Sequence, residues 1–131
     1  MRFVLDSYAM ISFLQREKGF ETVKNAMEKS IQKGIKTLMT TVNWGEVYYI
    51  IKREEGALVA DAMVEIMDTL PVELLPADRE ITRKAAALKS EKKMSYADCF
   101  AAAAAIMNKA VLITGDKEFK KVEKQIETEW I

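Results

Sequence analysis

Four acidic residues are the part of this sequence best suited to chemistry. Each stands just past a predicted strand or in the first turn of the helix that follows: Asp6, Glu46, Asp98 and Asp116. Ligands of open parallel sheets bind outside the carboxyl ends of the strands, so we expect these side chains to meet at one edge. Clustered carboxylates repel one another, and a divalent cation relieves that repulsion. Mg²⁺ or Mn²⁺ takes oxygen ligands and keeps waters that can be activated against a phosphate.

The same acids also have a purely structural interpretation. Asn43-x-x-Glu46 and Ser95-x-x-Asp98 match the capping box, in which the acid reaches back to the amide that begins the helix. Asp6 and Asp116 could be simple N-caps. Capping explains each acid taken alone, whereas their common position favours a shared metal site.

Hydroxyl groups and a glycine stand beside two of these acids. Ser7 follows Asp6, while Thr114 and Gly115 precede Asp116. The hydroxyls of Ser7 and Thr114 could orient the carboxylates by hydrogen bonds. Gly115, which has no side chain, would allow a close approach of the backbone.

Lysines near the predicted site have two interpretations. Lys92 and Lys93 lie in the loop predicted before Ser95, and Lys117 follows Asp116. These side chains could bind the phosphates of a nucleic acid. They could equally form an ordinary solvated surface, where most lysines are found.

The composition excludes several other kinds of site. The sequence has no histidine, which removes Ser-His and Cys-His nucleophiles and nearly all catalytic zinc sites. Cys99 is the only cysteine, which fits a reducing cytoplasm. The 20 basic and 20 acidic residues balance, so a polyanion would need a local patch or metal ions. No segment resembles an export signal or a membrane span, so we expect a cytoplasmic protein without membrane contact.

The elements that position these residues alternate along the chain. Predicted strands cover residues 3–5, 35–41, 72–75, 111–113 and 127–131. Predicted helices follow Asp6 and cover residues 21–33, 43–55, 57–70, 79–89, 96–107 and 117–124, with a loop at 90–93. At 131 residues the chain suits one domain. Alternating strands and helices predict an α/β fold, a three-layer α/β/α sandwich with a central parallel five-stranded sheet.

The chain resembles the PIN domain family, and within it the VapC-type toxins. The resemblance extends over the whole chain in the right order. The motifs that carry it are Phe3-Val-Leu-Asp6-Ser7, Glu46 early in a helix, Ser95-Tyr-Ala-Asp98, and Leu112-Ile-Thr-Gly-Asp116-Lys-Glu-Phe119.

The resemblance implies a single PIN domain over residues 1–131 with strand order 3-2-1-4-5. It further implies a Mg²⁺- or Mn²⁺-dependent ribonuclease, a cognate antitoxin that blocks the site, and homodimers. The acidic quartet of the family corresponds to the four acids above, as catalytic groups and metal ligands, with Thr114 as its usual hydroxyl neighbour. Asn43-Trp-Gly45 departs from the family pattern, which more often has small or hydroxyl residues there.

We therefore expect a metal-dependent endoribonuclease acting on RNA. The alternative is a non-catalytic PIN-like α/β interaction module whose acids bind metal weakly or only cap helices. A phosphatase of the haloacid dehalogenase type would need an Asp two residues after Asp6, where Tyr8 stands. Apolar residues between 43 and 70 exceed what one face against a sheet needs, which also predicts a dimer.

Overall fold

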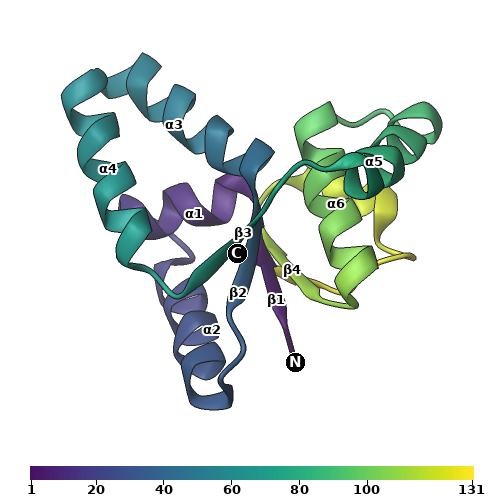
Figure 1. The fold of residues 1–131 in the computed structure, drawn as a ribbon, viewed down its shortest axis with the longest axis horizontal. Helices are drawn as coiled ribbons and strands as arrows, with labels where there is room; N and C mark the ends of the chain where they lie inside the picture. The colour runs from purple at the N-terminus through teal and green to yellow at the C-terminus, as the bar shows by residue number, and fades with distance from the viewer.

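The computed structural model describes residues 1–131 around a five-stranded parallel sheet (Figure 1). Its strands are β1 (Phe3–Leu5), β2 (Thr37–Thr40), β3 (Val72–Leu75), β4 (Val111–Thr114) and β5 (Thr128–Trp130). They lie in the order β3-β2-β1-β4-β5, so the predicted strand order is confirmed. β1 pairs with both β2 and β4, which places the winding reversal at β1 and β4.

Helices cover both faces of this sheet. They are α1 (Ser7–Leu14), α2 (Phe20–Lys33), α3 (Thr41–Glu55), α4 (Ala57–Thr69), α5 (Arg79–Glu91), α6 (Tyr96–Asn108) and the short 3-10 helix η1 (Lys117–Val122). α1 to α4 lie on one side of the sheet, and α5 and α6 lie on the other (Figure 1). The predicted three-layer α/β/α arrangement is therefore confirmed. None of these helices combines the length and apolar character that crossing a membrane requires.

Alternation along the strands divides the core in two. Leu5 and Ile113 pack with the α1 to α4 layer, whereas Val4 and Leu112 pack with the α5 and α6 layer. Residues Ala101 to Ala105 are fully or almost fully buried. Small side chains on every face let α6 pack closely against the sheet and α5, which fixes the start of α6 at the edge of the sheet.

Several element boundaries differ from the predicted ones. Thr40, rather than Asn43, begins α3, because its hydroxyl accepts the Asn43 amide at 3.1 Å and β2 runs into the helix without a loop. β2 begins at Thr37, since the amide of Ile35 closes the end of α2 by bonding to Ser30. At the other side of the fold, α5 extends to Glu91, and the 117–124 segment is a 3-10 helix that ends at Val122.

Candidate active site

A pocket of about 890 Å³ opens at the carboxyl ends of β1 and β4. All four predicted acids line it: Asp6, Glu46, Asp98 and Asp116. They come from four separate elements, the end of β1, α3, α6 and the turn before η1. Two further acids, Glu17 and Glu118, also line this pocket, which no sequence pattern indicated.

Asp6 both caps a helix and faces the pocket. Its side chain is 2 % exposed, and its Oδ1 accepts the Ala9 amide at 2.8 Å, which begins α1. The Thr114 hydroxyl donates to Oδ2, and the same hydroxyl accepts the Asp116 amide at 3.0 Å. Thr114 thus joins the end of β1 to the loop that carries Asp116. Ser7, the other predicted hydroxyl, lines the pocket.

Asp98 lies in the first turn of α6 and is 8 % exposed. The Ser95 hydroxyl accepts the Asp98 amide at 3.1 Å, so Ser95 caps the helix as predicted. The second bond of a capping box, from the Ser95 amide to the Asp98 carboxylate, is not formed. Its carboxylate therefore faces the pocket without serving as a cap.

Glu46 is held by Asn43, a residue of the same helix that the sequence predicted as its N-cap. The capping box predicted at Asn43-x-x-Glu46 is wrong, since Asn43 lies inside α3 and Glu46 is in its second turn. Asn43 is buried, and its side-chain amide Nδ2 donates to Glu46 Oε1 and to the Ala97 carbonyl, both at 3.1 Å. Asn43 therefore positions the Glu46 carboxylate and links α3 to the first turn of α6.

Burial and mutual repulsion make the carboxylates of Asp6 and Asp98 costly to ionise. Burial raises the pKa of Asp6 to about 7; hydrogen bonds from Thr114 and Ala9 lower it, and the charges of Asp98 and Asp116 raise it. Burial also raises the pKa of Asp98 to about 6, with the charge of Asp116 as the next contribution. Such shifts in a pocket are typical of functional sites.

The donor set fits a hard divalent cation. Every acidic group in the pocket offers oxygen, and a positive ion would relieve the mutual repulsion that adds to the effect of burial on the pKa values of Asp6 and Asp98. No three acids are already grouped closely enough to enclose one ion. Mg²⁺ does not require such a cage, because it is usually held by one or two carboxylates and several waters.

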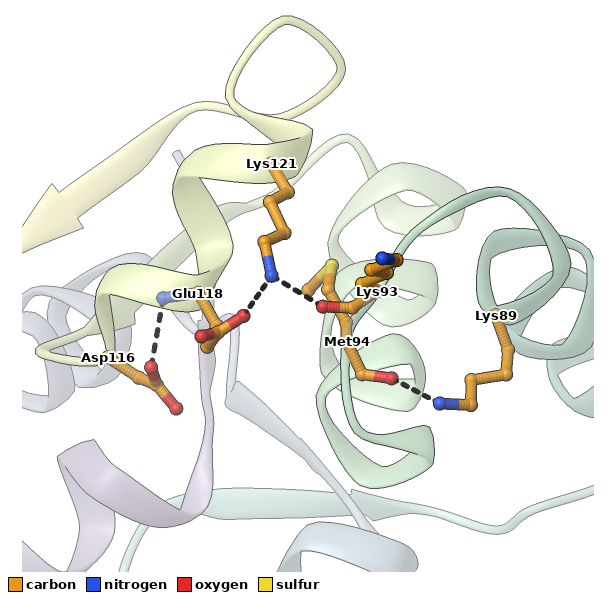
Figure 2. A network of polar contacts seen from close by, with 6 residues as sticks. All are labelled: Lys89, Lys93, Met94, Asp116, Glu118 and Lys121. Carbon is orange, nitrogen blue, oxygen red and sulfur yellow. Dashed lines mark hydrogen bonds and ion pairs between the residues drawn. The ribbon is translucent and has the colours of Figure 1, made fainter.

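The predicted phosphate-binding lysines lie outside the pocket. Lys92, Lys93 and Lys117 do not line it, whereas Lys18, which the sequence did not single out, does. Figure 2 shows a further lysine, Lys121, whose ammonium contacts the Glu118 carboxylate and the Lys93 carbonyl, the latter at 2.6 Å. This contact ties η1 to the loop before α6.

Gly115 allows the close approach that the sequence predicted, and its neighbour is the side chain of Tyr8. A Cβ at this position would lie 2.3 Å from Cε1 of Tyr8, so the ring of Tyr8, rather than backbone, occupies the space beside Gly115. Tyr8 also lines the pocket. Only the glycine suggested a close approach here; the partner became visible in the structure.

Comparisons with known proteins agree with this architecture. The family profile described as PIN domain matches residues 3–125. The fold is similar to VapBC2 from Rickettsia felis bound to a promoter DNA fragment, with a TM-score of 0.78, 16 % identity and 98 % of each chain covered. It is similar to DNA-bound VapBC from Salmonella typhimurium, with a TM-score of 0.76, 17 % identity, and 98 % and 97 % covered.

A third similar structure is VapC20 from Mycobacterium tuberculosis, a toxin that cleaves the sarcin-ricin loop. Its TM-score is 0.69 at 14 % identity, with 90 % of this chain and 92 % of that chain covered. No curated protein sequence matches the chain. The family match covers nearly the whole chain, and the strand order agrees with it. The chain therefore belongs to the PIN domain family.

Proposed function

We propose that this protein is a Mg²⁺- or Mn²⁺-dependent endoribonuclease that acts in the cytoplasm as the toxin of a toxin–antitoxin pair. The observation that carries the proposal is the convergence of four acids from four elements in one pocket. The fold shared with VapC20, a toxin that cleaves the sarcin-ricin loop, favours RNA as the substrate.

The four acids divide into two pairs in this proposal. Asp6 and Asp98 hold the cation, and Glu46 and Asp116 add ligands directly or through water. When bound, the cation supplies an activated water and stabilises charge on the phosphoryl oxygens. Thr114 keeps the Asp6 carboxylate oriented by its hydrogen bond, and Asn43 does the same for Glu46. Because Thr114 and Asn43 are buried, the carboxylates of Asp6 and Glu46 could bind a cation without changing their orientation.

The direct test is cleavage of single-stranded RNA by the Asp6→Asn variant. Asn keeps the side-chain volume and one oxygen but removes the charge, so cation affinity falls. We expect cleavage to drop by about a hundredfold or more, the scale of losing one essential electrostatic group. Folding should be preserved by circular dichroism, and RNA binding should survive because a negative charge has been removed.

The matched control is Asp78→Asn. Asp78 caps α5 by accepting the Ile81 amide at 3.1 Å, as Asp6 caps α1, but it does not line the acidic pocket. Its substitution should leave the cleavage rate unchanged. Equal rates for Asp6→Asn and the parent, or cleavage by the parent in excess EDTA, would contradict the proposal.

A non-catalytic PIN-like interaction module is the second candidate. It is favoured by the observation that Asp6 and Asp116 both cap helices and that no ready cage for an ion exists. In such a module the melting temperature would not rise with Mn²⁺, whereas a metal enzyme is stabilised by the ion it binds.

The proposal includes two protein partners. VapBC structures pair a toxin of this fold with an antitoxin, which favours a small cognate antitoxin here. Apolar side chains are exposed on α4 and β3, namely Leu58, Ile66 and Leu74. Covering them favours a homodimer, as expected from the sequence.

A further inference from the structure

The acidic pocket contains an apolar wall that the metal site does not use. Tyr8 lies in the first turn of α1, two residues after Asp6, and Ile11 lies one helical turn further along. Both line the pocket, and together we call them the α1 ledge. The Tyr8 side chain is 47 % exposed, so its ring is accessible in the same pocket as the Asp6 carboxylate.

The ring of Tyr8 lies in the space beside Gly115 where a side chain would otherwise be. The nearest ring atoms to a Cβ built at residue 115 would be Cε1 at 2.3 Å, Cζ at 2.6 Å and Cδ1 at 2.9 Å. Gly115 is not among the residues with positive φ, so its backbone conformation does not require glycine. A side chain at this position would displace the Tyr8 ring, and glycine leaves room for it. The ring therefore lies against the turn between Thr114 and Asp116.

The charge of the pocket explains why an aromatic contact would be needed. Six acids line it, Asp6, Glu17, Glu46, Asp98, Asp116 and Glu118, against the single basic residue Lys18. One divalent cation leaves this pocket negative, so Coulomb attraction does not hold the phosphates flanking the cut. Stacking of a base on an aromatic ring does not depend on charge, and every base offers a face for it.

From this geometry we propose that Tyr8 is a base-stacking subsite for a nucleotide next to the cleaved phosphate of single-stranded RNA. The inference rests on the proposed ribonuclease function and adds the contact that fixes the substrate register. Gly115 leaves the space in which the ring lies. The ligand is an unpaired nucleobase, because a base stacked in a duplex has no free face for the ring.

The test combines substitutions of Tyr8 with removal of single bases from the RNA. The parent, Tyr8→Phe, Tyr8→Ala and the control Tyr49→Ala would each cut an oligonucleotide whose cleavage position is mapped. Matched oligonucleotides would lack the base on one or the other side of the cut. Tyr49 is 50 % exposed on α3 but does not line the pocket, so it controls for loss of an exposed ring.

We expect loss of the ring and loss of the base to have the same, non-additive effect. For the parent, Tyr8→Phe and Tyr49→Ala, removing the base at one flanking position should raise KM about tenfold, the scale of one stacked base. On intact RNA, Tyr8→Ala should have about the same raised KM that the parent has on RNA lacking that base. On the RNA that lacks the base, the KM of Tyr8→Ala should not rise further. Dissociation constants from fluorescence anisotropy in EDTA should follow the same pattern without cleavage.

Two results would overturn the inference. The first is a Tyr8→Ala variant with the KM and dissociation constant of the parent. The second is a Tyr8→Ala variant that remains as sensitive to the missing base as the parent. If the parent never cuts RNA in Mn²⁺, the ribonuclease proposal fails; a base-stacking role of Tyr8 then stands if Tyr8→Ala weakens the binding of intact single-stranded RNA in EDTA about tenfold and Tyr49→Ala does not, and falls otherwise.

Discussion

The charge of Asp6 should make the metal-free protein less stable as the pH rises. Its carboxylate is buried at the end of β1, close enough to Asp98 and Asp116 for their charges to raise its pKa. Replacing it by Asn keeps the shape of the side chain and leaves an oxygen that can accept the Ala9 amide. The substitution therefore removes the charge while keeping the cap of α1.

The direction and size of this effect on stability follow from the pKa of Asp6. The carboxyl of Asp6 has a pKa of about 7 in the folded protein, against the ordinary value of 3.8 for an unfolded chain. Because the folded pKa is raised, the stability linked to the protonated group is complete below pH 3.8 and is lost as the pH rises through about 7. A difference of about three units at about 1.4 kcal/mol each gives about 4 kcal/mol.

The assay is urea unfolding of the parent and Asp6→Asn in EDTA between pH 4.5 and 8. The free energy of unfolding of the parent should fall relative to the variant by several kcal/mol over this range. Asp78→Asn, which removes a capping carboxylate outside the pocket, should keep the pH dependence of the parent. If the free energy of unfolding of Asp6→Asn falls with pH as steeply as that of the parent, Asp6 does not carry the buried charge and the reasoning is refuted.

Two further predictions concern the metal and the assembly. Asp98→Asn should leave the metal-free protein unchanged or more stable at pH 8, because its carboxylate makes no capping bond, and should reduce the Mn²⁺-dependent rise in melting temperature. Clear destabilisation with the full Mn²⁺ response would restore the capping role. Light scattering at micromolar concentration should give the mass of a dimer, and Leu58→Asp, which charges a side chain that is 89 % exposed, should shift it toward monomer.

The fold was predictable because hydrophobic periodicity marks each element. Phe3, Val4 and Leu5 form an uninterrupted apolar run, as expected of a strand buried on both faces. The boundary at β2 was not predictable, because Thr40 and Asn43 are both good N-caps and only the pairing of β2 shows which one begins α3. Local sequence cannot decide between two adequate caps.

The acids that line the pocket were predictable by type and position, and Thr114 was predictable as a hydroxyl neighbour, whereas the carboxylate that Thr114 binds was not. A carboxylate after a strand is visible in sequence, but the Thr114 hydrogen bond to Asp6 depends on the pairing of β1 with β4. The Tyr8 contact with Gly115 likewise joins residues far apart in the chain. The sequence indicated Thr114 and Gly115 themselves, but the residues that they contact appear only when the strands are assembled.

The hydrogen bonds of Asp6 show that capping a helix would not prevent the same carboxylate from binding the proposed cation. Each of its oxygens already accepts one hydrogen bond, from the Ala9 amide and the Thr114 hydroxyl. A carboxylate has about four acceptor positions, so one on each oxygen is left for a cation or its waters. The positive end of α1 favours the charged form of Asp6, yet burial and neighbouring acids outweigh that attraction and raise the pKa. Asp6→Asn rather than Asp6→Ala is therefore the informative change, because Ala would remove the cap together with the charge.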